Sequence, residues 1–343
     1  ARRDDYTGFG STTNPKASFR LAPTDDLIIR GSSSSGFRVP TFNQLFFGVT
    51  ESPYSGKDLV DPLKCASGKV DATKPECAAV TPTILTGGKP TLGPETSRSW
   101  TVGAVWAPAR DVTLGADLWQ IRREGTIQSL DLTTLISNYT LFPTNFIRDA
   151  AGNLITIDQR WVNAGETITK GLDLSARANG TLGQGRWMLL AEGTRLLDKR
   201  SRLLASAPFG DSEVGVFSRA GDLGLRWKHN LVATYTEGVW TTTLVQRYRA
   251  GYKDFVLPGV ANGSIIPPNW DPNVKAYTTY DISVRYSGIK NLGLTAGIKN
   301  LLDTNPPFSV AYDSNTGAGS SWEPRVADPR GRSFIFTLDY KFF

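Results

Sequence analysis

The side chains that most often perform catalysis are scarce in this sequence of 343 residues. It contains one histidine, His229, two cysteines, Cys65 and Cys77, and 32 acidic residues. A histidine-based catalytic triad would depend on His229, and a metal site with two histidine ligands is impossible. No glycine-rich phosphate-binding loop of the dinucleotide or Walker type occurs. We therefore expect no enzyme activity, no catalytic residue, no metal site and no bound cofactor.

Aromatic and charged side chains in the polar segments suggest ligand binding instead, because rings stack on ligands and a guanidinium pairs with anions. The candidates are Tyr252, Phe255, Trp270, Tyr312, Trp322 and Arg325. The alternative is that these side chains only pack the segments together. A nucleic-acid partner is not expected, since the formal charge of +6 is spread along the chain rather than gathered in one stripe.

The elements that position these side chains are predicted to be β-strands. In the closing segment GRSFIFTLDYKFF, apolar and polar residues alternate from Phe334 to Phe342. A period of two is typical of a strand with one apolar and one polar face. LRWKHNLVATYT, AYTTYDISVRY and NLGLTAGIKN alternate in the same way, and we count about a dozen such strands. Helical periodicity occurs only briefly, near 40–46 and 131–136.

Short and long connections alternate along the chain. Short turns are expected near 179–184, 236–239 and 287–291. Long loops rich in Gly, Pro, Ser and Asn are expected near 37–94, 126–156, 200–221, 251–273 and 303–330. This asymmetry is typical of an up-and-down membrane barrel, which has turns at one end and loops at the other. No apolar run is long enough for a transmembrane helix.

The two faces of the predicted strands differ in a way that favours a membrane barrel. The polar face carries charges in mid-strand, such as Arg226, Asp281 and Lys299, which suit a water-filled lumen. Aromatic residues stand toward the ends of the apolar face, such as Trp100 and Trp106, and would form the girdles at the two membrane interfaces. A soluble β-sandwich is the alternative, because its strands also alternate.

Several segments resemble, in order and spacing, the C-terminal half of a TonB-dependent outer-membrane receptor. They are GFRVPTFNQLFF (36–47), TLGPETS (91–97), VNAGETITKGLDL (162–174), YTTYDISVRY (277–286), GIKNLLDTNPP (297–307) and GRSFIFTLDYKFF (331–343). Together they extend over nearly the whole chain. The opening segment, residues 4–23, resembles the mid-barrel segment that precedes the first of these motifs.

The resemblance implies an all-β fold, an antiparallel up-and-down transmembrane β-barrel of about 22 strands around an N-terminal plug. With about 12 strands, residues 1–343 would form the C-terminal half of that barrel, without the plug domain and the N-terminal strands. The chain would belong to an outer-membrane receptor of a Gram-negative bacterium that takes up a scarce solute by TonB-coupled active transport. The solute could be a ferric siderophore, cobalamin, a glycan or a peptide.

The resemblance also implies partners. These are outer-membrane lipid, the TonB complex acting through the plug, and a ligand at the extracellular loops. The barrel assembly machinery is a further partner, for which the terminal aromatic residues Tyr340, Phe342 and Phe343 would be the signal. A passive diffusion porin is the alternative function, and a β-rich secreted enzyme or lectin is a third. An upstream plug would distinguish the receptor from the porin.

Cys65 and Cys77 lie in the long loop 37–94, which would face the oxidising exterior, so we predict a disulfide between them. In the chain-entropy model a loop of this size stabilises by about 3 kcal/mol. A thiol pair that binds metal is the alternative. We also expect the strand near 16–21 not to pair with 334–342, because the opening residues resemble a mid-barrel segment rather than a first strand.

Overall fold

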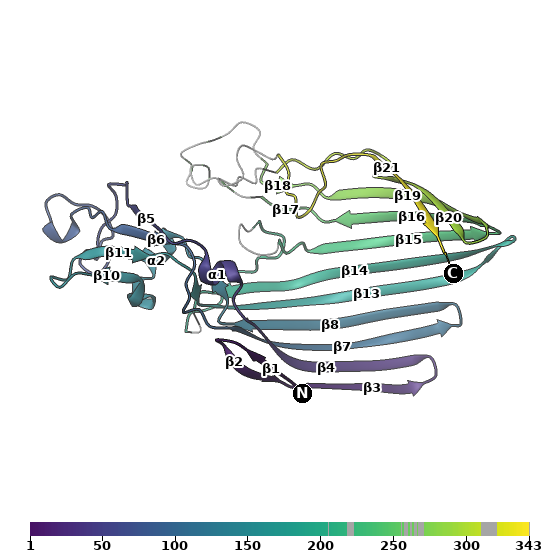
Figure 1. Ribbon diagram of the computed structural model, residues 1–343, viewed down its shortest axis with the longest axis horizontal. Coiled ribbons are helices and arrows are strands. Elements are labelled where there is room, and N and C mark those ends of the chain that lie inside the picture. Colours follow the sequence, from purple (N-terminus) through teal and green to yellow (C-terminus); the bar gives the residue numbers. More distant parts are fainter. Residues whose placement is uncertain are drawn as a thin grey trace.

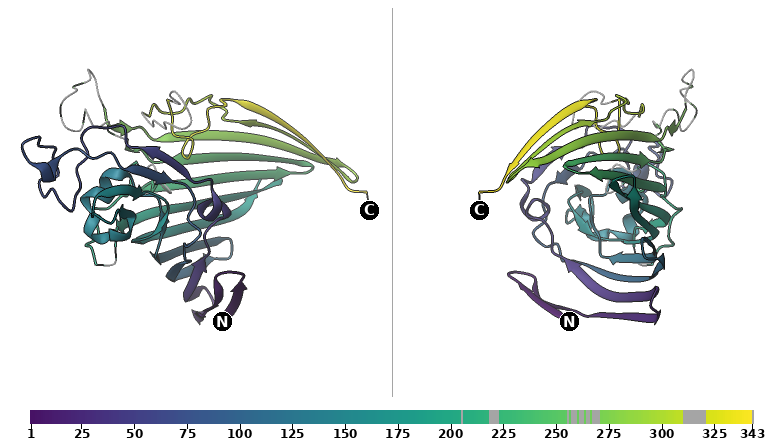
Figure 2. Two further views of the ribbon diagram at one scale, coloured as in Figure 1. Left: turned by 60° about the vertical axis from the view of Figure 1, so that its left-hand side comes forward. Right: turned by 90° about the vertical axis from the view of Figure 1, so that its right-hand side faces the viewer.

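The computed structural model describes residues 1–204, 206–217, 223–254, 256, 260, 263, 266, 271–309 and 321–342. Its main feature is one antiparallel sheet of 11 strands, which curves into an open trough (Figures 1 and 2). The strands are β3 (Lys16–Thr24), β4 (Leu27–Arg38), β7 (Glu95–Ala109), β8 (Val112–Glu124), β13 (Glu166–Leu182), β14 (Gly185–Arg202), β15 (Trp227–Glu237), β16 (Trp240–Arg249), β19 (Tyr277–Ile289), β20 (Leu292–Lys299) and β21 (Ser333–Tyr340).

Each inner strand of this series pairs with the one before it and the one after it, so the sheet has the predicted up-and-down topology. Three hairpin turns hold residues with positive φ, namely Gly183, Gly238 and Asn291 at 61°, 56° and 63°. Glycine and asparagine adopt this left-handed conformation at the lowest steric cost. The short turns lie together at one end of the sheet and the long connections at the other (Figure 1).

One face of the sheet carries a continuous apolar row from β15 to β21. Residues paired across antiparallel strands point to the same side, so the register identifies the face. Ala233, Leu244, Ile282, Ile298 and Phe334 form one continuous row across β15, β16, β19, β20 and β21. The predicted lipid-facing side chains of these strands therefore share a face. Because nothing but lipid can cover such a surface in a membrane barrel, we take it as the lipid face.

The opposite face is polar and carries the mid-strand charges. A single row of the register holds four of them, and it runs from β4 across β7, β8, β13 and β14 to β15. They are Arg30 on β4, Asp117 on β8, Asp173 on β13 and Lys228 on β15. The Arg30 guanidinium donates to both carboxylate oxygens of Asp117 at 2.9 and 2.6 Å. This is the pattern of a water-filled lumen wall.

Two long connections fold together at the loop end. β5 (Thr50–Pro53) and β6 (Thr83–Thr86) come from the first, and α2 (Leu132–Ser137), β10 (Phe146–Arg148) and β11 (Leu154–Asp158) come from the second. They form a four-stranded sheet in the order β10-β11-β6-β5, in which β6 and β11 are parallel. A small apolar core holds this loop body together, made of Leu59, Leu130, Leu135, Phe142, Phe146, Leu154, Ile157 and Ala164.

The remaining elements are short. They are the hairpin β1 (Arg2–Tyr6) and β2 (Gly10–Asn14), the pair β9 (Ile127–Gln128) and β12 (Val162–Asn163), the pair β17 (Tyr252–Lys253) and β18 (Asn273–Val274), helix α1 (Phe42–Phe46), and the 3₁₀ turns η1 (Pro75–Cys77), η2 (Tyr139–Leu141) and η3 (Pro143–Asn145). α1 and α2 occur where brief helical periodicity was expected. Neither these nor the other described helices could cross a membrane.

The main sheet is open, as expected. β3 and β21 are its two edge strands, and within the described part of the chain they pair with their inner neighbours rather than with each other. Figure 2 shows the two edges separated across the trough.

Candidate functional site

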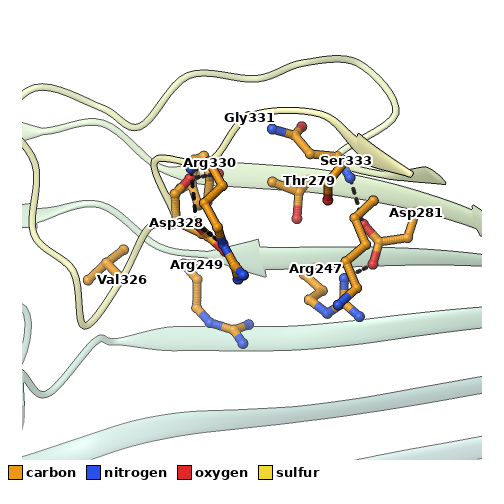
Figure 3. A pocket seen from close by; sticks show the side chains of 12 residues that line it. Arg247, Arg249, Thr279, Asp281, Val326, Asp328, Arg330, Gly331 and Ser333 are labelled. Atoms are coloured by element: carbon orange, nitrogen blue, oxygen red, sulfur yellow. Dashed lines mark hydrogen bonds and ion pairs between the residues drawn. The ribbon is translucent and has the colours of Figure 1, made fainter. Parts of the chain in front are cut away.

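A pocket of about 260 Å³ lies at the loop end of the charged face (Figure 3). Its floor is formed by the loop-side ends of β16, β19, β20 and β21, and the segment that leads into β21 closes it from above. The charged side chains that line it are Arg247, Arg249, Lys299, Arg330, Asp281 and Asp328. Four cations against two carboxylates leave the pocket with a formal excess of positive charge.

The strand period brings Arg247 and Arg249 to the same face of β16, since they are two residues apart. The Arg247 guanidinium forms an ion pair with Asp281 of the neighbouring strand β19. Asp281 also accepts a hydrogen bond from the backbone N–H of Asn300 at 2.9 Å. Arg249 donates to the carbonyl of Tyr248 at 2.9 Å. Among the described residues, no carboxylate lies within ion-pair distance of Arg249 or of Lys299.

A tight turn after β20 positions the upper wall of the pocket. Asn300 and Asp303 have left-handed φ values of 49° and 54°. The Asn300 side chain donates to the Thr304 carbonyl and accepts from the Thr304 N–H, both at 2.9 Å. Asp303 accepts from the N–H of Arg332 at 2.8 Å, which ties the turn to the segment entering β21.

Asp328 and Arg330 are paired in that segment. Their closest nitrogen and oxygen atoms are 2.5 Å apart, and the Arg330 side chain is largely exposed. The hydrogen bonds from the Arg330 side chain and backbone lower the pKa of Asp328 to about 2. The carboxylate therefore remains charged at neutral pH, and Arg330 is held at the mouth of the pocket.

A second hollow of about 380 Å³ lies further along the charged face. It is lined by the carboxylates Asp117, Asp173 and Glu192 and by Lys228, and Arg249 borders both hollows. The lumen wall thus changes from predominantly basic near β21 to mixed near β13. No group of three or more His, Cys, Asp or Glu residues suited to a metal ion occurs in the described part of the chain.

The ligand-binding residues predicted from sequence are not brought together in this pocket. Tyr252 is buried and donates to the Ser309 hydroxyl at 3.2 Å, and burial raises the pKa of Tyr252 to about 12. Arg325 forms a bidentate pair with Glu323 and stands 5.3 Å from the ring centre of Phe217. Trp322 is half-buried and directly precedes Glu323 in the sequence. Phe255, Trp270 and Tyr312 lie outside the described residues, as does Phe343.

Asp281 and Lys299 were expected on the polar face, but the other four charged pocket residues, Arg247, Arg249, Asp328 and Arg330, were not predicted from the sequence. The segment VQRYRAG contained a usable signal, because two arginines alternate with an aromatic residue just before a long loop. Arg330 had no comparable signal. Its position depends on the fold of the loop before β21.

Cys65 and Cys77 form a disulfide within the loop body. Arg148 joins the two connections of this body by donating to both carboxylate oxygens of Asp61 at 2.5 and 2.6 Å. Burial is the largest single influence on Asp61 and opposes its ionisation, but the hydrogen bonds from Arg148 and from the Leu63 N–H, together with the positive charges of Arg148 and Lys64, outweigh it and keep the pKa of Asp61 below its usual value. His229 lies on the lipid face, stacked on Tyr248 with ring centres 5.0 Å apart.

An open antiparallel sheet with an apolar outer face, a charged inner face and large loops at one end defines a transmembrane barrel wall. The family model for the TonB-dependent receptor-like β-barrel matches residues 1–301. The chain therefore belongs to the TonB-dependent receptor β-barrel family, whose members are outer-membrane receptors. No curated protein sequence matches it.

Solved structures show the same fold at low sequence identity. The siderophore receptor PirA from Acinetobacter baumannii is 17% identical, with a TM-score of 0.61 over 99% of this chain and 42% of that one. A mutant of the ferric enterobactin receptor PfeA from Pseudomonas aeruginosa, in complex with enterobactin, is 16% identical with a TM-score of 0.62, over 98% and 42%. The copper transporter OprC is 16% identical, with a TM-score of 0.55 over 97% of this chain and 40% of that one. The chain thus spans about two-fifths of the length of these proteins.

Proposed function

We propose that this chain forms part of the wall and loops of an outer-membrane receptor that takes up an anionic metal chelate, such as a ferric siderophore, by TonB-coupled active transport. The basic pocket at the loop end of the lumen wall is the observation that carries the proposal. Family membership supports the receptor class, and the named functions of PirA and PfeA agree with a chelate as solute.

The chemistry of the pocket suits a ligand with several negative oxygens. A guanidinium presents a planar fork of donors that matches carboxylate or catecholate oxygens, and charge-assisted hydrogen bonds are about twice as strong as neutral ones. Arg247 is already neutralised by Asp281. Arg249 and Lys299, which have no carboxylate partner among the described residues, remain to receive the anion.

The outer-membrane setting supplies the other proposed partners. Lipid covers the apolar face, and the TonB complex acts through a plug inside the complete barrel. The barrel assembly machinery recognises the terminal strand, where Tyr340 and Phe342 are 53% and 78% exposed and pack edge to face. At the loops, Trp322 and Arg325 are proposed ligand contacts, whereas Tyr252 is buried and hydrogen-bonded to Ser309 and would act only from behind the loop surface.

Charge reversal at the pocket tests the proposal. In the complete receptor purified in detergent, Arg249→Glu should weaken binding of ferric enterobactin, a triply negative probe, by at least about tenfold, because a charge-assisted contact contributes about 1.5–3 kcal/mol. Arg186→Glu is the matched control, since Arg186 lies on the same face at the turn end of β14 and should change the affinity by less than about twofold. Equal effects of the two variants would refute a specific site.

Energy coupling separates the receptor from a passive diffusion porin. Cells that depend on the complete receptor for ferric chelate should lose uptake when TonB is deleted, because import against a gradient needs energy. Uptake that persists without TonB, and rises linearly with external chelate, would instead identify a porin.

A further inference from the structure

A chain of hydrogen bonds runs across the lipid face near its loop end. The indole Nε1–H of Trp227 donates to Nδ1 of His229 at 2.7 Å. Nε2 of His229 lies 3.2 Å from Oε1 of Gln246, and Nε2 of Gln246 donates to the hydroxyl of Tyr280 at 2.9 Å. These four polar side chains come from β15, β16 and β19 and stand on the lipid face, where most of their neighbours are apolar or aromatic.

The direction of donation along this chain is determined by its first member. An indole N–H can only donate, so Nδ1 of His229 must accept. The proton of the neutral imidazole is then on Nε2 and is donated to Gln246. Gln246 in turn donates to Tyr280, so the Tyr280 hydroxyl uses its oxygen as acceptor. Its O–H, and the second amide proton of Gln246, have no acceptor among the residues that the structure describes.

Unused donors are costly on this face. In hydrocarbon, an unsatisfied polar group costs several kcal/mol, because water is absent. Both Gln246 and Tyr280 are three residues inside the loop-side ends of their strands, Arg249 and Tyr277. At about 3.3 Å per residue this is about 10 Å along the strand. With the loop-side strand ends taken as the membrane surface, the two donors lie near the border of the hydrocarbon layer.

The same two side chains stand at the polar end of an apolar groove. The groove has a volume of about 550 Å³, and its body is lined by Leu114, Ala176, Leu189, Ala191, Leu231 and Leu244. Ala176, Ala191 and Leu231 are register partners on β13, β14 and β15, so two alanines leave a trough between larger leucines. A hollow of about 610 Å³ adjoins it beneath Trp227 and His229.

We propose that this groove binds one acyl chain of a lipid in the membrane leaflet at the loop end, with the ester carbonyl of that chain accepting from Tyr280 and Gln246. An acyl chain matches the apolar body, and a carbonyl is the group that a lipid presents at the depth of the two donors. The groove is continuous with the lipid face, which favours lipid over a protein partner. The inference rests on membrane insertion of the sheet and not on the identity of the transported solute.

The test is native mass spectrometry of the complete receptor, stripped of lipid by detergent exchange and titrated with dipalmitoylphosphatidylethanolamine. The wild type should bind one lipid molecule more tightly than any further lipid molecules. Ala191→Phe fills the groove and should weaken that equivalent at least about tenfold, and Tyr280→Phe removes only the hydroxyl and should weaken it about threefold to tenfold.

Two controls on the same face keep the result specific. Val102→Phe adds a ring outside the groove, and Tyr286→Phe removes a hydroxyl at the turn end of β19. Both should bind lipid as the wild type does. Identical binding by all five proteins would overturn the inference, as would a second receptor copy in place of lipid on the groove. Chelate binding by Ala191→Phe should be unchanged. A result that contradicts the lipid site would therefore leave the proposed transport function untouched.

Discussion

Replacing Ile282 by arginine should severely destabilise the inserted barrel. Ile282 lies in the middle of β19 and is flanked on the lipid face by Leu244 and Ile298. No carboxylate neighbours it in that row of the register. The charge would therefore stand near the middle of the hydrocarbon layer without a partner.

The expected cost follows from that depth. Arginine at the bilayer midplane of a barrel costs about 2–4 kcal/mol, which lowers the folding equilibrium constant about 30- to 700-fold. The same substitution at Ser283 is the matched control, because Ser283 is the next residue and pairs with Thr243 and Gly297 on the lumen face. At that position the guanidinium would be hydrated in the lumen, and we expect the substitution to lower the free energy of unfolding by less than about 1 kcal/mol.

The assay is a urea titration of the complete receptor folded in lipid vesicles. Folding is followed by tryptophan fluorescence and by the shift in gel-electrophoretic mobility between unheated, folded samples and heated, unfolded samples. Ile282→Arg should lower the unfolding midpoint markedly and Ser283→Arg only slightly. If both variants lower the unfolding midpoint equally, or if Ser283→Arg lowers it more than Ile282→Arg does, the assignment of faces is wrong.

Three further predictions concern the loops. Removing the disulfide by Cys77→Ser should destabilise residues 50–86 locally by about 3 kcal/mol, measured as faster hydrogen exchange there with β13 unaffected. The Asp61–Arg148 pair should make the loop body sensitive to acid. Because the pKa of Asp61 is lowered on folding, its stabilisation is fully present above the unfolded value of about 3.9 and is lost as pH falls through the lowered value. Pepsin, which is active in this acid range, should therefore cleave the wild-type loop body increasingly fast as the pH falls, with a steeper dependence on pH than in the Asp61→Asn variant, because Asp61→Asn removes this source of acid dependence. Finally, Asn300→Ala should destabilise by about 1–3 kcal/mol in the same urea titration, since it loses two hydrogen bonds and alanine tolerates the left-handed conformation less well than asparagine, whereas Asn300→Gly loses the same hydrogen bonds without that strain and should cost less.

Most of the barrel wall could be predicted from sequence because its signal is local. A strand with one face in lipid and one in water must alternate, so Ile282 and Ser283 could be assigned to opposite faces before their partners were known. The turns at Gly183, Gly238 and Asn291 are equally local, since each depends on one residue that tolerates positive φ. The predicted and observed topologies therefore agree.

The basic pocket could not be predicted in the same way. Arg249 and Arg330 are far apart in sequence and meet only because β21 pairs beside β20 and the preceding segment folds back over β16 and β19. The parallel pairing of β6 with β11 in the loop body is likewise invisible to periodicity. Alternation records which side of its own strand a residue occupies, whereas the neighbours of a loop residue depend on packing between segments distant in the chain. The sequence by itself thus determined the strands, their faces and the family, and the tertiary structure decided which charges share one site.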